Sequence, residues 1–273
     1  MKTAFICLFI FCLCFVLSGC RKTPVTAEPV YKMLGFSDST HKYACKYLND
    51  QISEIYFTDT MGKITSKAVL RNTYTYQTNY VKAVFANNPS QTYVEYFLND
   101  SSLPLKILVH NTIAGKDSLV KQKLFFYHGD SKTVLDSVLY TKAKENTYRI
   151  IPTYIDGNLF ECHTYQGTYR PAYIHYCQFK YLSTANLMRS PNQLLYIYND
   201  PELVEENFYL CNLFSPKAMD YFLVNGYVSM GNDSYTSVPQ GAGFSNISTN
   251  SRKQLTTEQY AGLFPYLRNY IYE

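Results

Sequence analysis

Between residue 40 and about residue 200 the chain repeats one short unit, and this unit limits the folds that it can adopt. An aromatic-rich run comes first, a turn of Asn, Asp or Gly follows, and an apolar run completes the unit. Asn, Asp and Gly accept the positive φ that tight hairpins need, while β-branched and aromatic residues favour the flanking strands. The turns are expected at Asn49-Asp50, Asn79, Asn99-Asp100, Gly129-Asp130 and Asp156-Gly157.

A tyrosine precedes each of these turns. The spacing between the tyrosines drifts between about 20 and 31 residues, so the repeat is degenerate. The chain holds 28 Tyr and 17 Phe but no Trp, and rings of these two types favour strands. Hairpins joined in chain order predict a mainly β fold, an antiparallel β-meander. The tyrosines are Tyr47, Tyr76, Tyr96, Tyr127 and Tyr154.

After residue 200 the pattern changes, and a few short helices are expected in the C-terminal third. Each begins at residues suited to a helix N-terminus, either a cap followed by proline or a capping box. Strands are expected over residues 221–230 and 266–273, with a long polar loop between 231 and 254. The helix starts are Asp200-Pro201, Ser215-Pro216, and Thr256 with Gln259.

Residues 1–19 predict a bacterial lipoprotein signal peptide. Lys2 gives a positive start, and the uncharged apolar run is marginal for a bilayer crossing, which takes ~20 residues, but typical of a signal peptide. Leu17, Ser18 and Gly19 then precede Cys20, as the lipoprotein signal peptidase requires. We expect the Cys20 thiol to carry a diacylglyceryl group and to become the new N-terminus. The alternative is an uncleaved signal anchor.

The membrane is therefore the expected partner, reached through lipid on Cys20. No acid follows this cysteine directly, which favours the outer membrane, and no acidic cluster directs the chain to the cell surface, so the periplasmic face is favoured. Residues 20–38 are expected to form a tether that holds the folded part off the bilayer. Residues 39–273 are expected to form a single β-rich domain, with hairpin repeats to about residue 200.

A tyrosine before an Asn, Asp or Gly turn, followed by an apolar-x-x-apolar strand, all behind a lipobox, resembles the YD-repeat-like β-meander lipoproteins of Gram-negative bacteria. The resemblance covers roughly residues 40–200, and no copy holds the full Tyr-Asp-x-x-Gly-Arg pattern. It implies an elongated, twisted sheet of hairpins. It implies no catalytic residue, since the residues of the repeat are structural.

Four cysteines remain in the part of the chain that would face an oxidising compartment, where disulfides persist. They are Cys45, Cys162, Cys177 and Cys211. Four cysteines allow three pairings, among which sequence does not choose. Cys162 with Cys177 is the favoured disulfide, because these two can face each other across a hairpin. Four buried thiols are the alternative.

The sequence predicts no catalytic, metal or cofactor site. Cys162 and His163 lie beside His175 and Cys177, but neighbouring residues of a strand point to opposite faces, so the four cannot all converge on a metal. The acids between Asp200 and Glu206 suit the first turn of a helix, where the dipole favours them. The formal net charge of +4, without a basic run, does not predict nucleic-acid binding.

These observations favour a lipid-anchored protein of the cell envelope that acts as a non-enzymatic scaffold or binding surface for protein or glycan. A carbohydrate-active enzyme of the envelope is the alternative. That alternative requires two carboxylates ~5–10 Å apart in a cleft.

Overall fold

The computed structural model divides the chain into two compact units, Met1–Tyr31 and Lys32–Glu273. The first unit lies outside the described residues. The structure describes residues 33–37, 41–59, 67–86, 92–129, 132–142, 147–167, 172–185, 210–211, 213–230, 234–240, 243–249, 255–261 and 266–272.

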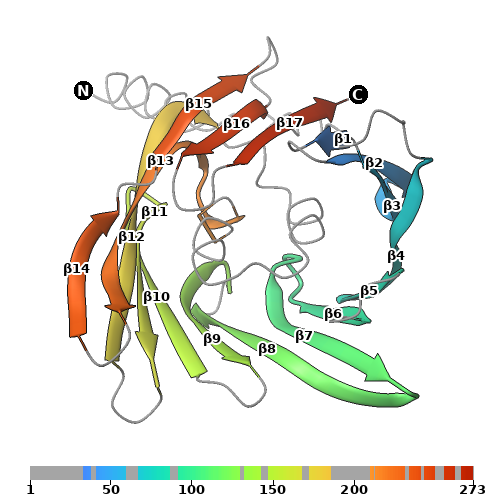
Figure 1. Ribbon diagram of the computed structural model, residues 1–273, viewed down its shortest axis with the longest axis horizontal. Coiled ribbons are helices and arrows are strands. Elements are labelled where there is room, and N and C mark those ends of the chain that lie inside the picture. The colour runs from blue at the N-terminus through green and yellow to red at the C-terminus, as the bar shows by residue number, and fades with distance from the viewer. Residues whose placement is uncertain are drawn as a thin grey trace, which may run out of the picture. The chain divides into compact units, whose positions relative to one another are not determined.

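Seventeen strands form one sheet (Figure 1). Their bounds are β1 Met33–Ser37, β2 His41–Leu48, β3 Gln51–Asp59, β4 Val69–Gln77, β5 Tyr80–Phe85, β6 Tyr93–Leu98, β7 Pro104–Ile113, β8 Lys116–His128, β9 Val134–Lys142, β10 Thr147–Ile155, β11 Asn158–Gln166, β12 Ala172–Ala185, β13 Lys217–Met230, β14 Ser234–Gln240, β15 Gly243–Thr249, β16 Leu255–Ala261 and β17 Tyr266–Tyr272. The sheet begins at Met33, inside the range expected for the tether.

The strands follow one another as an antiparallel meander. Each strand from β1 to β13 pairs with the next, and β15, β16 and β17 pair in the same way. The first strand also pairs with the last, so that Phe36 faces both Tyr43 of β2 and Tyr270 of β17. The predicted mainly β meander is confirmed.

Tight turns fall where the sequence predicts them. Asn49 and Asp50 have φ of 51° and 62° between β2 and β3, and Asn79 has φ of 57° between β4 and β5. Asp156 and Gly157 follow the same pattern between β10 and β11, with φ of 50° and 75°. Asn and Asp tolerate this left-handed region because their short polar side chains bond locally.

Two connections differ in detail from the prediction. Between β6 and β7 the positive φ belongs to Ser102, while the Asn99 side chain accepts the backbone N–H groups of Ser101 and Leu103 at 2.9 and 3.0 Å. The β7–β8 turn at Ala114 and Gly115 was not expected from the sequence. Alanine gives no turn signal, since it rarely takes a positive φ.

Four hairpins share a β-bulge just after the turn. In each, one extra residue of the second strand is inserted opposite the end of the first strand. The residue before the bulge then lies across from the last residues of the preceding strand. These four residues are Ile52, Pro104, Leu135 and Leu159.

A tyrosine of the following hairpin reaches the backbone at three of these bulges. The Tyr76 hydroxyl donates to the carbonyl oxygen of Ile52 at 2.8 Å, and the Tyr127 hydroxyl donates to that of Pro104 at 2.7 Å. Tyr181 donates in the same way to Leu159. The sequence separations are 24, 23 and 22 residues. Two tyrosines of the sequence repeat, Tyr76 and Tyr127, together with Tyr181, thus link successive hairpins.

The two faces of the sheet between β2 and β12 differ in chemistry. The face that we call the covered face holds the apolar core, and Leu210, Leu213 and Phe214 pack in the same cluster. Lys123 is the charged exception on this face, with its ammonium 5.3 Å from the Tyr140 ring centroid. The core residues of the covered face include Ile52, Ile55, Val81, Ala83, Val94, Tyr96, Ile107, Val109, Phe125, Leu135, Val138, Ile150, Leu159, Cys162, Cys177 and Phe179.

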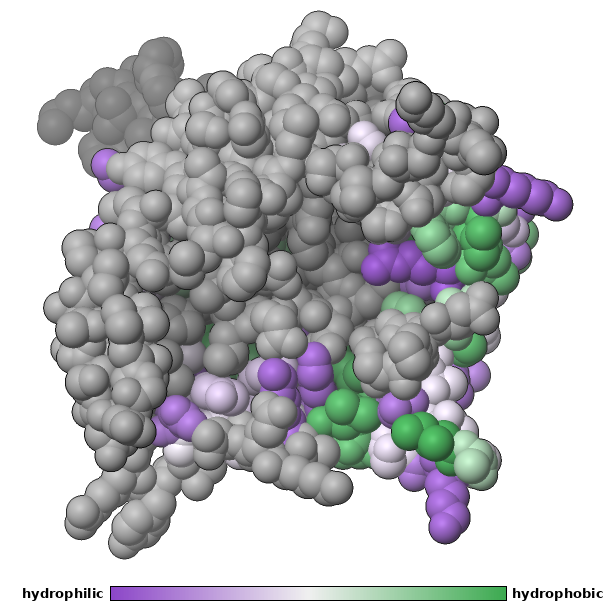
Figure 2. Space-filling model, viewed as in Figure 1, coloured by the Kyte–Doolittle hydropathy of each residue, from purple (hydrophilic) through white to green (hydrophobic). Residues whose placement is uncertain are grey.

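The opposite face, which we call the exposed face, carries the residues that alternate with this core. Polar and apolar side chains are interleaved there, and the coloured part of the surface in Figure 2 shows the same mixture. Charged residues and histidines of the exposed face include Lys46, Glu54, Lys82, Glu95, Lys106, His110, Glu161, His163 and Lys180.

The C-terminal third holds more strand than the sequence predicts. Residues 210–211 and 213–214 are helical, but β13 begins where a helix was expected after Ser215-Pro216. The helix expected from Thr256 is instead β16, and the expected loop contains β14 and β15. Ladder hydrogen bonds to neighbouring strands override the local capping signal here. Within the described ranges no helix has the length and hydropathy that a bilayer crossing needs.

Candidate functional site

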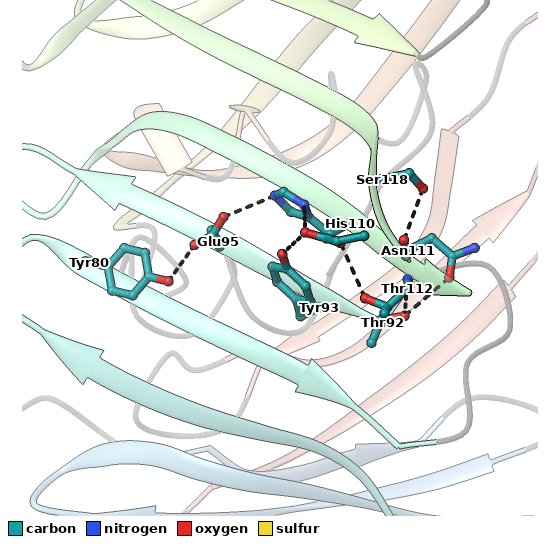
Figure 3. A network of polar contacts seen from close by, with 9 residues as sticks. Tyr80, Thr92, Tyr93, Glu95, His110, Asn111, Thr112 and Ser118 are labelled. Carbon is teal, nitrogen blue, oxygen red and sulfur yellow. Dashed lines mark hydrogen bonds and ion pairs between the residues drawn. The ribbon is translucent and has the colours of Figure 1, made fainter. Parts of the chain in front are cut away.

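Four neighbouring strands bring a group of polar and aromatic side chains together on the exposed face (Figure 3). Because side chains alternate along each strand, the register alone decides which of them meet. Lys82 of β5 lies opposite Glu95 of β6, and Tyr93 of β6 lies opposite His110 of β7. The β5–β8 network, as we call it, comprises Tyr80, Lys82, Tyr93, Glu95, His110, Thr112 and Asp117.

His110 lies between two carboxylates. Its Nε2 is 3.1 Å from Glu95 Oε2, and its Nδ1 is 3.3 Å from Asp117 Oδ2. These are ion-pair distances without the alignment of a hydrogen bond. Each carboxylate also accepts a tyrosine hydroxyl: Tyr80 donates to Glu95 Oε1 at 2.7 Å, and Tyr93 donates to Asp117 Oδ2 at 2.5 Å. Thus both acids are held by partners from other strands.

The rings of the network are engaged through their faces as well as their hydroxyls. The Tyr93 and His110 rings stack with centroids 4.4 Å apart and an interplanar angle of 8°. The Lys82 ammonium lies 3.9 Å from the Tyr93 centroid, and the Lys106 ammonium lies 4.2 Å from that of Phe97. Lysines and a histidine therefore occupy ring faces on which a planar or sugar ligand would otherwise stack.

Hydrogen bonding sets the ionisation of this surface. The hydrogen bond from Tyr93, with smaller contributions from His110 and Thr112, lowers the pKa of the Asp117 carboxyl. The same bond, more than desolvation, raises the pKa of Tyr93 to about 12. Desolvation and then the bond to Glu95 raise the pKa of Tyr80 to about 12. Near neutral pH both phenols keep their protons and Asp117 is charged.

Polar contacts at the edge of the network fix the β7–β8 hairpin against β6. The backbone N–H of Thr112 donates to Thr92 Oγ1 at 2.8 Å, and Thr92 Oγ1 lies 3.3 Å from Asn111 Oδ1. The Ser118 hydroxyl donates to the Asn111 carbonyl oxygen at 3.0 Å. The network thus rests on a hairpin that is bonded to Thr92 and across its own two strands.

The same chemistry recurs elsewhere on the exposed face. On β2 and β3, Lys46 pairs with Glu54 at 3.1 Å, and Tyr56 donates to Glu54 at 2.8 Å. On β11, His163 lies 3.0 Å from Glu161 and stacks on Tyr176 of β12. Groups of an acid, a basic side chain and a ring in contact with one another are therefore a recurring feature of this face.

A second polar cluster lies on the covered face where residues 210–216 pack on β11 and β12. Ser215 Oγ accepts the backbone N–H of Leu159 at 3.0 Å and lies 2.8 Å from the Tyr181 hydroxyl. The Tyr181 hydroxyl is also 3.0 Å from Cys211 Sγ. Side chains thus satisfy both backbone groups of Leu159, which lies beyond the last paired residues of β11 and β12, Glu161 and Gln178.

The two favoured cysteines are brought together. Cys162 and Cys177 are directly opposite in the β11–β12 register, and both side chains are fully buried on the covered face. Cys45 lies on β2, and Cys211 lies beside Tyr181. The disulfide itself stays a prediction. Cys162 and His163 do lie on opposite faces, and among the described residues no three His, Cys, Asp or Glu side chains are placed to hold a metal.

The lipidation site lies outside the described residues, as do the signal-peptidase motif Leu17, Ser18 and Gly19, Cys20 itself, and the acidic group from Asp200 to Glu206. The β5–β8 network was not expected from the sequence. Alternation along "YVEYFL" and "YVKAVF" marks each strand, but the network depends on the β7–β8 hairpin, whose turn carries no strong signal.

No protein-family model matches the chain, and no curated protein matches it significantly. Among solved structures, the chain is similar to a porin-like protein from Bacteroides uniformis, with a TM-score of 0.54 and 12% sequence identity over 90% of this chain and 98% of that one. A porin-like protein from Bacteroides vulgatus aligns with a TM-score of 0.46 and 11% identity, over 88% of this chain and 98% of that one. The first likeness concerns the fold alone.

Proposed function

We propose that the chain is a lipid-anchored protein of the bacterial outer membrane, held through Cys20, whose sheet lies in water and serves as a non-enzymatic scaffold or binding surface for a protein partner. The observation that carries the proposal is the chemistry of the exposed face between β2 and β12. The lipobox at Leu17 to Cys20 supports the anchor, and the periplasmic side remains the favoured one. The resemblance to YD-repeat-like lipoproteins stays a prediction.

Charges on the exposed face argue against contact with hydrocarbon. Strands that cross a membrane turn apolar residues toward lipid, and a lysine or arginine facing the bilayer midplane costs about 2–4 kcal/mol. Here the apolar face is the covered one, while Lys46, Lys82, Glu95 and Lys106 belong to the exposed face. The cost of each lysine falls from this midplane value to about 0–1 kcal/mol near the membrane interfaces. The charges together therefore suit this face to water.

The similarity in fold to a porin-like protein of Bacteroides uniformis supports a cell-envelope setting. It does not make the chain a channel, because the arrangement of the two faces is the reverse of the one that lipid requires. Covalent lipid supplies the membrane affinity instead. Each buried methylene adds about 0.8 kcal/mol, and two or more acyl chains hold a protein stably.

A protein partner fits the exposed face better than a glycan. Sugars stack on open aromatic faces, but Lys82 and His110 contact the Tyr93 ring, and Lys106 lies over Phe97. A surface of rings, acids and lysines that already satisfy one another can pair with a second such surface without burying an unpaired charge. The enzyme alternative gains nothing here, since Glu95 and Asp117 are both bonded to tyrosines on an exposed sheet face.

Exchange of the lipoprotein signal for an ordinary cleavable signal peptide tests the proposal directly. Replacing Leu17 to Cys20 by an Ala-x-Ala cleavage site keeps export but removes the acylated cysteine. We expect this variant in the soluble envelope fraction, with the wild type in the membrane fraction. Recovery of the variant in washed membranes, resistant to alkaline carbonate, would show that the sheet itself sits in the bilayer and would overturn the proposal.

The acylation step has its own readout. Labelled palmitate should appear on the wild-type chain and on the matched control Cys14→Ala, which changes a cysteine of the apolar run before the lipobox. Cys20→Ala should leave an unlabelled, unprocessed precursor. Normal maturation of Cys20→Ala would contradict the anchor, whatever the location of the sheet.

A further inference from the structure

We infer that Cys162 and Cys177 form a disulfide across β11 and β12 as the chain folds in an oxidising compartment. The juxtaposition of the two side chains carries this inference. Directly opposed residues of an antiparallel pair have Cα atoms about 4.5–5.5 Å apart, inside the 4.4–6.8 Å that disulfides span. Cys162 faces Cys177 in an unbroken stretch of register from Glu161–Gln178 to Thr164–His175.

Contacts on the exposed face lock this register. Gln178 donates to Glu161 Oε1 at 3.0 Å on one side of the cysteine pair. On the other side the His163 and Tyr176 rings stack with centroids 5.5 Å apart. A slip of one residue between the strands would turn one of the two cysteines to the exposed face and would break both contacts. The two thiols are therefore held opposite each other by the strands themselves.

Burial decides when the bond can form. Both cysteine side chains are 0% exposed, in one cluster with Phe179 and Leu210. A disulfide donor cannot reach sulfurs in that position, so exchange must precede the packing of residues 210–216 on the covered face. One thiolate attacks the donor disulfide to give a mixed disulfide, and the second thiolate displaces the donor. The chain loses two hydrogens, and the donor leaves as two thiols.

Cys211 is the competing thiol. It lies 3.0 Å from the Tyr181 hydroxyl. Burial is the main cause of the raised pKa of Tyr181, and both Cys211 and Cys162 add to it, so the three groups share one neighbourhood. Cys211 belongs to residues 210–216, however, which reach the sheet only when the covered face closes. Cys162 and Cys177 meet as soon as the β11–β12 hairpin forms.

The experiment is refolding of the full chain from denaturant in a glutathione buffer containing the disulfide form, followed by alkylation in denaturant and mapping of unreduced peptides. We expect one linked pair, Cys162 with Cys177, and alkylation of the other six cysteines of the full chain, Cys45 and Cys211 among them. Cys162→Ser should leave Cys177 alkylated, whereas the matched control Cys45→Ser should leave the linked pair intact. Absence of the linked pair, or a pair that includes Cys211, overturns the inference.

A second measurement does not depend on peptide recovery. The disulfide closes the loop between Cys162 and Cys177 and so restricts the unfolded chain. Reductant should therefore lower the Tm of the oxidised wild type by roughly 5–10 °C. The Tm of Cys162→Ser/Cys177→Ser should not respond to reductant. An equal response of the two proteins would also overturn the inference. A pair that forms in the refolded chain but is reduced in cells would contradict the proposed export, not the pairing.

Discussion

Single residues on the exposed face act through one another. Asp117 accepts hydrogen bonds from Tyr93 and Thr112 and lies beside His110, so its charge is shared among three side chains from β6 and β7. The contact with Tyr93 spans 24 residues of sequence, and the contacts with Thr112 and His110 depend on the β7–β8 hairpin. Residue identity alone therefore does not reveal them, and each becomes predictable only once the strand register is known.

The Tyr93 hydroxyl is expected to control the ionisation of Asp117. Tyr93→Phe keeps the ring stack on His110 but removes the first cause of the lowered carboxyl pKa, so this pKa should rise toward 3.8. Because the folded-state pKa is depressed, the stabilisation is present above the ordinary pKa and is lost as pH falls through the folded value. NMR titration of the carboxyl carbon measures the change.

Thr112→Val is the matched control for this prediction, since Thr112 contributes less to the lowered pKa than Tyr93 does. Its Asp117 pKa should rise by a smaller amount. An unchanged pKa in Tyr93→Phe would contradict the assignment of the bond.

On the covered face, the Ser215 hydroxyl likewise supports another residue through a hydrogen bond. Ser215→Ala leaves the buried N–H of Leu159 without its acceptor, which should lower the free energy of unfolding by about 1–3 kcal/mol. The exposed Ser101→Ala should change it by less than about 0.5 kcal/mol. Denaturant titration with circular dichroism compares the two, and equal midpoints would show that Leu159 finds another partner.

At the scale of elements, the unit of construction is a hairpin with a bulge, bonded to the next hairpin by a tyrosine. The bulge withdraws a carbonyl oxygen from the regular ladder, and Tyr76, Tyr127 and Tyr181 each satisfy one such oxygen. The β4–β5 hairpin has a regular register without a bulge. This explains why the sequence repeat drifts: the geometry needs a tyrosine near each bulge, not a fixed spacing.

Removal of one hydroxyl should therefore destabilise the sheet measurably. Tyr76→Phe and Tyr127→Phe should each lower the free energy of unfolding by about 1 kcal/mol, because a buried carbonyl loses its donor. Tyr148→Phe is the matched control, since Tyr148 stacks on Tyr140 with ring centroids 6.0 Å apart and lies away from the bulge of its hairpin. A loss in Tyr148→Phe as large as in the other two would refute the role given to the bulge bond.

The sequence predicts those elements whose signals are local. Turns with Asn, Asp or Gly at positive φ, as at Asn49 and Gly157, were expected because these residue types lower the cost of that conformation. The strand at Tyr266–Tyr272 was expected from its alternation. The strand at Leu255–Ala261 was not, because "TTEQ" satisfies a helix capping box equally well, and only pairing with β15 and β17 selects the strand.

For the whole molecule, the decisive feature is that the first strand pairs with both the second and the last. We call the pairing of β1 with β17 the seam. Residues at opposite ends of the sequence, such as Phe36 and Tyr270, face each other across it. Contacts of such sequence separation form late, since loop-closure entropy must be overcome first. The hairpin repeats of the sequence could not predict the pairing of β1 with β17, because no hairpin contains both strands.

Gly35 is expected to be essential to the seam. A Cβ atom at this position would collide with the carbonyl oxygen of Tyr43 in β2, so Gly35→Ala must push β1 away from its neighbour. We expect faster hydrogen exchange at the backbone amides of β1 and β17, which pair with each other.

Gly115→Ala is the matched control for the seam. It places alanine at a φ of 77° in a tight turn, with nothing within 4 Å of the new atom, and should cost about 1 kcal/mol through backbone strain alone. Exchange in β1 and β17 should be slower in this variant than in Gly35→Ala. The opposite order would show that the seam tolerates a side chain at Gly35.

The seam also decides how the protein answers a mechanical load. Met33 opens β1 on the side of the chain that leads back to Cys20, so under the proposed anchorage at Cys20 tension would enter the sheet at this five-residue strand before any other. β1 would peel from both neighbours first, and the hairpins that follow would yield one after another. The pairing of β1 with β17 would then be the first part of the attached molecule to yield.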